Sequence, residues 1–266
     1  IVTGGAGTGK TTIIKEMANQ CHNVTLCCPT GKAAARLREA SGMPTKTIHS
    51  MLGYNGIGFN VGELTGRTII VDEASMMDSS ILAAIIERKP AKLVLVGDDA
   101  QLVPVGAGQP FHDLIKLRPD IVVNLTICYR NKEAVYQAAT KIRNGDAPDK
   151  HQKSKEERWE IRNTGKVEKT IDIICDWVRS GMLDFECDII LSPKNDFVNE
   201  VNKRVLEIIS PRKGEKWRVG DRVMCLKNNP DIDTWNGTTG TITGIDNLGR
   251  VFVKGDIPFI VDGESQ

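Results

Sequence analysis

The chain has 266 residues, of which 40% are hydrophobic and 26% are charged, a balance that can fill a globular core. Its net charge of +1 provides no overall basic footprint, so any nucleic acid would have to be bound by local patches. No apolar run approaches the roughly 18–20 residues of a membrane span, and the sequence does not predict a secretory signal. We therefore expect a cytoplasmic protein without a membrane partner. Its seven cysteines, an odd number without a C-x-x-C pair, are expected to be free buried thiols rather than metal ligands.

Short apolar runs alternate with helical patterns over the first 125 residues. Strands are predicted over residues 1–3, 24–28, 68–72, 93–96 and 121–124, and helices over residues 10–20, 31–40, 79–88 and 108–116. Continuous apolar strands alternating with helices indicate an α/β fold with a parallel sheet covered on both faces. The first predicted strand begins at the first residue, which is unusual for a core strand. We therefore expect this chain to be a piece of a longer protein.

The remaining sequence predicts a second, shorter α/β unit and then a small β-structure. Helices are predicted over residues 133–143, 167–180 and 196–208, a strand over 187–191, and a charged loop over 145–165. After Trp217, strand-like runs at 223–226, 239–245 and 250–253 are separated by turn sequences at Asn236-Gly237 and Leu248-Gly249, as in a β-barrel or meander. The expected domains are residues 1–125, 126–216 and 217–266.

A glycine-rich segment between the first predicted strand and helix matches the phosphate-binding pattern G-x-x-x-x-G-K-[ST]. Glycines let successive backbone N–H groups converge on phosphates, and the next helix presents its positive N-terminal end to the anion. Lys10 is expected to reach the β- and γ-phosphates, and the Thr11 hydroxyl to hold Mg²⁺. The predicted ligand is ATP with Mg²⁺, and the predicted ATP-binding residues are Gly4, Gly5, Ala6, Gly7, Thr8, Gly9, Lys10, Thr11 and Thr12.

Acidic and amide side chains follow two other predicted strands. Asp72 and Glu73 come directly after an apolar strand, where Asp72 would hold Mg²⁺ together with Thr11, and Glu73 would polarise the attacking water. Gln101 follows the next strand and could sense the γ-phosphate or orient water. Each feature alone has a plainer reading as a helix start or turn cap, and their combination with the glycine loop favours catalysis.

These segments, in this order, resemble the motifs of superfamily 1 helicases, and most closely the RecD-like branch related to the alpha subunit of exodeoxyribonuclease V. The matching segments are residues 4–11, 28–34, 47–52, 71–76, 97–104 and 128–130, with further similarity at 191–194 and 218–243. The resemblance implies a P-loop, RecA-like motor domain, part of a second RecA-like domain, and an SH3-like barrel. It also implies an ATP hydrolase that moves 5′ to 3′ on single-stranded DNA.

The same resemblance assigns further residues. It implies that Arg130 reaches the γ-phosphate from the second domain, and that a hairpin near residues 54–66 acts as a pin at duplex junctions. The residues that it places against DNA are Pro29, Thr30, Lys32, Thr47, His49, Ser50, Tyr54 and Phe59. The alternatives are a helix start for Thr30 and Lys32, a structural role for His49, a plain surface hairpin, and a surface salt bridge for Arg130.

Three elements of the family have no counterpart in the sequence. They are the glutamine motif that usually contacts adenine and two later motifs, one of which carries a second catalytic arginine. We therefore expect this chain alone to bind ATP and to hydrolyse it slowly or not at all. Two other interpretations stay open: a non-motor ATP-binding subunit of a recombination complex, which would bind other subunits of that complex, and the helicase domain of a conjugative relaxase.

Overall fold

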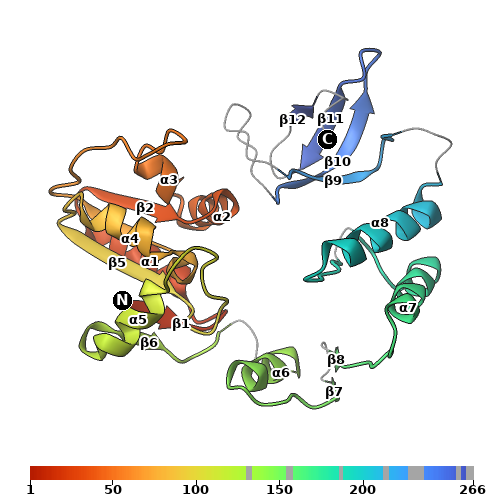
Figure 1. The fold of residues 1–266 in the computed structure, drawn as a ribbon, viewed down its shortest axis with the longest axis horizontal. Coiled ribbons are helices and arrows are strands. Elements are labelled where there is room, and N and C mark those ends of the chain that lie inside the picture. Colours follow the sequence, from red (N-terminus) through yellow and green to blue (C-terminus); the bar gives the residue numbers. More distant parts are fainter. Residues whose placement is uncertain are drawn as a thin grey trace. The chain divides into compact units, whose positions relative to one another are not determined.

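The computed structural model describes residues 1–129, 134–153, 158–185, 188–211, 216–226, 237–255 and 259–261 (Figure 1). The chain is divided into two compact units. The first contains Ile1–Trp159, and the second contains most of the chain from Glu160 onward. Arg130 and Asn236, two residues singled out in the sequence, lie outside the described residues.

A six-stranded parallel sheet is the centre of the first unit. Its strand order is β3-β2-β4-β5-β1-β6, and each neighbouring pair is parallel. The strands are β1 (Val2–Gly4), β2 (Val24–Cys28), β3 (Thr45–Thr47), β4 (Thr68–Val71), β5 (Lys92–Gly97) and β6 (Val123–Leu125). The predicted parallel sheet is thus confirmed. The edge strand β3 was not predicted, because three residues with a half-polar sequence carry no strand pattern.

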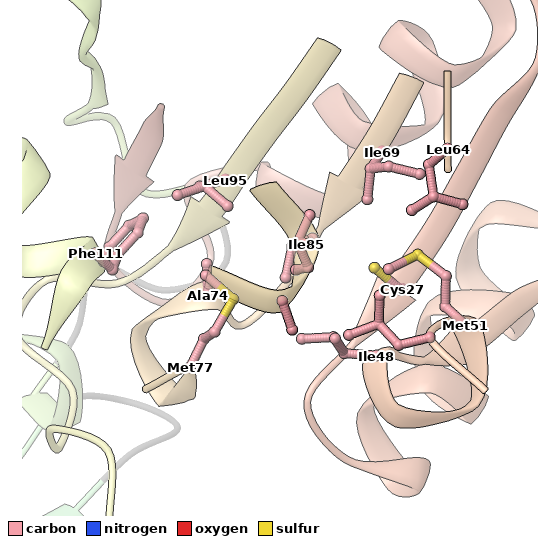
Figure 2. Close-up of a cluster of buried hydrophobic side chains, with 13 residues drawn as sticks. Cys27, Ile48, Met51, Leu64, Ile69, Ala74, Met77, Ile85, Leu95 and Phe111 are labelled. Atoms are coloured by element: carbon pink, nitrogen blue, oxygen red, sulfur yellow. The ribbon is translucent and has the colours of Figure 1, made fainter. Parts of the chain in front are cut away.

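Helices cover both faces of this sheet, as the continuous apolar strands predict. Alternate residues of β4 point to opposite faces: Ile69 and Val71 join one core cluster and Ile70 joins the other. The first cluster, shown in Figure 2, also holds Phe111. It packs beneath α3 (Ile48–Met51), α4 (Ser79–Ile86) and α5 (Pro110–Leu117), whereas α1 (Lys10–Gln20) and α2 (Gly31–Ser41) cover the other face.

Short elements complete the first unit. They are the 3-10 turns η1 (Ala74–Met76) and η2 (Pro119–Ile121), helix α6 (Ala134–Arg143), and the paired strands β7 (His151–Lys153) and β8 (Arg158–Glu160). The strands β7 and β8 both lie in the segment 145–165 that was predicted as a charged loop, so that prediction was only partly correct.

The second unit contains a helix pair and an antiparallel sheet. Helices α7 (Val167–Arg179) and α8 (Asn195–Ile209) enclose a small apolar cluster that includes Ile174 and Val201. The sheet has the order β12-β11-β10-β9, formed by β9 (Arg222–Met224), β10 (Thr239–Ile245), β11 (Val251–Gly255) and β12 (Phe259–Val261).

One predicted strand of the second unit is wrong. Asp188–Leu191 is irregular, although the sequence predicts a buried strand over 187–191, of which residue 187 lies outside the described residues. Ile189 and Leu191 are exposed, and only Ile190 packs against the cluster between α7 and α8. A central strand requires neighbours on both sides, and none of the described residues of this unit pairs with the segment. An apolar run alone therefore does not suffice to form a strand here.

Burial suppresses the reactivity of two adjacent thiols in β2. Desolvation raises the pKa of Cys27 to about 12, and it raises the pKa of Cys28 still further above the ordinary range. None of the six cysteines among the described residues forms a disulfide bond. Among the helices of the described residues, none has the length and apolar composition of a membrane span.

Candidate nucleotide-binding site

The glycine loop joins the end of β1 to the start of α1, at the carboxyl edge of the sheet. Gly9 forms the helix N-cap with φ of 88°, a left-handed conformation that favours glycine. At Gly4 a Cβ atom would lie 2.7 Å from Thr8 Oγ1 and 2.8 Å from the carbonyl oxygen of Leu125. Only glycine fits this position. The Thr8 hydroxyl donates a hydrogen bond to the Gly5 carbonyl at 2.9 Å and so closes the loop.

Lys10 directs its ammonium group into the loop. Its Nζ donates hydrogen bonds to the carbonyl oxygens of Gly4 at 2.8 Å and of Gly5 at 2.9 Å. Thr11 is half-buried beside it in the first turn of α1, and Thr12 is exposed. The loop thus combines a fixed positive side chain with the positive end of a helix, an arrangement that suits phosphate.

Two carboxylates follow β4, which is separated from β1 by β5 in the sheet. Asp72 is buried, and its Oδ1 accepts a hydrogen bond from the Glu73 amide at 2.9 Å. Burial raises the pKa of Asp72 to about 6, while the positive charge of Lys10 acts in the opposite direction. The charge of Lys10 is thus felt at the Asp72 carboxylate.

Glu73 has a strained backbone, with φ of 53° in the left-handed region. Its Oε2 is buried and has no hydrogen-bond partner among the described residues. A strained residue with an unsatisfied buried oxygen is costly in a fold, and such features gather at functional sites. These features distinguish Glu73 from an ordinary solvated helix start.

The end of β5 forms a tight turn that carries Gln101. The Asp98 carboxylate accepts a hydrogen bond from the Ala100 amide at 3.0 Å, and the Asp98 carbonyl accepts one from the Gln101 amide at 3.2 Å. The Gln101 side chain is exposed. Because β5 lies between β4 and β1, this turn lies at the same sheet edge as Asp72 and the glycine loop.

A cavity of about 570 Å³ opens beside the loop. It is lined by Thr8, Gly9, Thr12, Ile13, Asn124, Leu125, Thr126, Ile127 and Tyr129. Tyr129 is mostly exposed, and its backbone amide donates to the Gly7 carbonyl at 2.9 Å, which fixes the segment after β6 against the loop. The sequence did not indicate this cavity. Its lining joins the glycine loop to residues 124–129, and the pairing of β6 with β1 that brings these two segments together leaves no local pattern in the sequence.

Six of the eight residues expected to contact DNA lie at the starts of α2 and α3, and the other two lie in the hairpin after α3. The Thr30 side chain accepts a hydrogen bond from the Ala33 amide at 3.3 Å and caps α2, the structural alternative that its sequence position offered. Thr47 likewise caps α3 by accepting from the Ser50 amide at 3.1 Å. Pro29 and Lys32, on either side of the α2 cap, are half-buried.

An aromatic cluster holds the hairpin that follows α3. The ring centroids of His49 and Tyr54 are 5.3 Å apart, as are those of Tyr54 and Phe59. Phe59 also packs under the Arg88 guanidinium, which donates a hydrogen bond to the Phe59 carbonyl at 3.0 Å. At the hairpin tip, Ile57 is 95% exposed. The predicted hairpin is present, and the rings of Tyr54 and Phe59 help to fix it.

Mg²⁺ fits the oxygen donors of this site. Thr11 and Asp72 provide a hydroxyl and a carboxylate, which are hard ligands of the kind that Mg²⁺ prefers. The described residues contain no cluster of three or more His, Cys, Asp or Glu side chains that could enclose a metal. Mg²⁺ usually completes its octahedron with phosphate oxygens and water. The site therefore suits a nucleotide-bound Mg²⁺.

Comparison with known proteins places this geometry in a family. Residues 1–164 match the model of the AAA domain, so the chain belongs to that family of P-loop proteins. The ATP-dependent RecD2 DNA helicase of Deinococcus radiodurans is 32% identical over 259 residues, which cover 91% of this chain and 36% of that protein. The RecBCD enzyme subunit RecD of Mycolicibacterium smegmatis is 34% identical over 183 residues, 55% of this chain and 33% of that subunit.

The predicted resemblance to RecD-like helicases is thereby confirmed. This chain spans about a third of the length of these curated relatives. Its fold is also similar to that of the Pif1 helicase from Bacteroides solved with ADP-AlF3 and single-stranded DNA, with a TM-score of 0.55 and 21% identity over 98% of this chain and 69% of that one.

Proposed function

We propose that this chain is the ATP-binding part of a RecD-like DNA helicase, which couples ATP hydrolysis to 5′ to 3′ movement on single-stranded DNA. The observation that carries the proposal is the convergence of the glycine loop, the Asp72–Glu73 pair and the Gln101 turn at one sheet edge. A phosphate loop joined at the sheet edge by the polar ends of two further strands suits ATP hydrolysis rather than passive anion binding.

In this proposal each residue has a defined task. The β- and γ-phosphates replace the Gly4 and Gly5 carbonyls as partners of the Lys10 ammonium. Thr11 and Asp72 hold Mg²⁺, which supplies charge neutralisation at the phosphates. The unpartnered Glu73 oxygen accepts a hydrogen bond from the attacking water and, as general base, its proton. Arg130, outside the described residues, is the proposed cation at the γ-phosphate.

The cavity beside the loop is the proposed place of the nucleoside. Its size fits a base with its ribose, and its lining is mainly apolar and hydroxyl-bearing. The exposed ring of Tyr129 offers an aromatic surface for stacking. Because stacking tolerates any base, we propose that the cavity adds affinity rather than strict selection of adenine.

Single-stranded DNA is the proposed second ligand. The RecD2 relative is described as a DNA helicase, and the Pif1 structure contains single-stranded DNA. We propose that the starts of α2 and α3, with Lys32 and Ser50, contact the sugar–phosphate chain, and that the hairpin around Ile57 meets duplex junctions. In the cap bonds the Thr30 and Thr47 oxygens act only as acceptors, so each O–H can still donate a hydrogen bond to a phosphate oxygen.

A test must separate a motor from the non-motor ATP-binding subunit. We expect that Mg·ATP and a single-stranded oligonucleotide change each other's affinity for the chain by the same factor, because coupling between two ligands is reciprocal. Fluorescence anisotropy of a labelled oligonucleotide, measured with and without a non-hydrolysable ATP analogue, gives this factor. ATP binding with no effect of DNA would favour the non-motor interpretation, and no binding of ATP would reject both.

A further inference from the structure

One arginine outside all the helicase-like motifs contacts the nucleotide site. Arg143 is the last residue of α6, and its side chain is 31% exposed. Its Nη1 donates to Asp98 Oδ1, and its Nη2 donates to Asp99 Oδ1 at 2.6 Å. The two arms of one guanidinium therefore bridge two consecutive carboxylates at the end of β5.

The first carboxylate supports the turn that carries Gln101. The Asp98 side chain is only 9% exposed, and a buried carboxylate is unfavourable without a cation or several donors. Its Oδ1 accepts from Arg143 as well as from the Ala100 amide. Arg143 thus neutralises the group around which the turn from Asp98 to Gln101 folds.

The second carboxylate leads to the phosphate loop. Asp99 Oδ1 also accepts a hydrogen bond from the Thr3 hydroxyl at 2.9 Å, and Thr3 directly precedes the first glycine of the loop. The guanidinium itself lies against the loop, since a Cβ atom at Gly5 would be 3.3 Å from Arg143 Nη1. One side chain therefore touches both the loop and the turn.

We propose that Arg143 is a positioning residue for ATP hydrolysis. It holds the Gln101 turn in a fixed position relative to the phosphate loop and attaches α6 to both. The proposal deepens the function proposed above and rests on it. A simple surface ion pair does not account for the arrangement, because one partner is buried and the contacts join three elements. Arginine is required, because the single ammonium of lysine cannot reproduce the two-armed bridge.

The variants Arg143→Met and Arg143→Lys test the proposal in the intact chain. Because a small misplacement of reacting groups can reduce a rate by roughly 100-fold, we expect a loss of about that size in single-turnover ATP hydrolysis for Arg143→Met. We expect the dissociation constant for Mg·ATP to change by less than about threefold, since the loop residues remain. Arg143→Lys should recover only part of the rate.

A matched control is Arg118→Met. Arg118 also donates through two nitrogens, Nε and Nη2, to a carboxylate, that of Asp120, but both side chains are exposed just after α5. This variant should leave the hydrolysis rate and the affinity for ATP unchanged. If Arg143→Met hydrolyses ATP like the wild type, or if ATP affinity falls as much as the rate, the positioning role is overturned.

Amide hydrogen exchange distinguishes failure of this proposal from failure of the proposed function. In the nucleotide-free protein, Arg143→Met should speed exchange at Ala100 and Gln101 while leaving the interior of α1 unchanged. This comparison requires no ATP hydrolysis, so it holds even where the wild type turns over slowly. Unchanged exchange at the two amides would overturn the proposal, whereas failure of the wild type to bind ATP would instead reject the proposed function.

Discussion

At the scale of single residues, the site contains groups that are unfavourable for folding alone. Asp72 is buried with a raised pKa, and Glu73 combines a left-handed backbone with an unpartnered buried oxygen. Stability alone would select against both features, because each costs free energy that a hydrogen-bonded or apolar residue would not. A Mg²⁺ ion and an attacking water are the species that would use them.

Replacing Glu73 by Gln should separate chemistry from binding. The amide is nearly isosteric with the carboxylate but cannot accept a proton, so single-turnover hydrolysis should fall by about 10²- to 10⁴-fold. Equilibrium titration with Mg·ATP should show affinity close to that of the wild type. A variant that keeps the wild-type hydrolysis rate would remove Glu73 from the proposed mechanism.

The pKa of Asp72 predicts how the metal-free protein responds to pH. Its pKa is 3.8 when unfolded and about 6 when folded, so the folded state holds the proton more tightly. The tighter binding of this proton stabilises the folded state. The stabilisation is fully present below the unfolded pKa of 3.8 and is lost as pH rises through the folded pKa of about 6. Asp72→Asn lacks the titration. Denaturant unfolding should therefore show the variant gaining stability relative to the wild type between about pH 4 and about pH 6. A difference that is constant with pH would contradict the shift.

At the scale of elements, much of the first unit could be predicted from local pattern. The alternation of apolar strands with amphipathic helices indicated the parallel sheet, because strands such as β4 are apolar on both faces. Three-residue strands such as β3 carry too few residues for a pattern. Contacts between residues far apart in the sequence leave no local pattern at all. Arg143 lies 45 residues from Asp98, and no motif or spacing in the sequence links the two.

The cap of α2 provides a test at this scale. Thr30→Ala removes the acceptor for the Ala33 amide and should lower the free energy of unfolding by about 1 kcal/mol. Thr30→Ser retains the hydroxyl and should stay close to the wild type. Thermal or denaturant unfolding of the three proteins measures the effect. Equal stability of the alanine and serine variants would show that the cap bond contributes nothing.

At the scale of the whole molecule, the two units differ in how much of their structure the sequence predicted. The first has two extended core clusters around one sheet, whereas the helix pair of the second encloses a small cluster. The strand predicted over 187–191 failed because an apolar run specifies burial but not the neighbours that a strand needs. The predicted SH3-like barrel and the three domain boundaries stay predictions.

The core of the first unit can be tested with a matched isoleucine pair. Ile85 is fully buried in α4, and Ile57 is 95% exposed at the hairpin tip. Ile85→Ala should lower the free energy of unfolding by about 2–5 kcal/mol through lost burial and the cavity left behind. Ile57→Ala should change it by less than about 0.5 kcal/mol. Similar effects at the two positions would contradict the packing.

The binding of Mg·ATP to the glycine loop is the central claim, and calorimetric titration of the intact chain measures it most directly. We predict saturable binding with one nucleotide per chain, which is lost or greatly weakened in Lys10→Ala, because that variant lacks the ammonium that faces Gly4 and Gly5. Arg118→Met serves as the control for removal of a positive charge elsewhere. Absence of binding to the wild type, or equal binding to Lys10→Ala, would contradict the account.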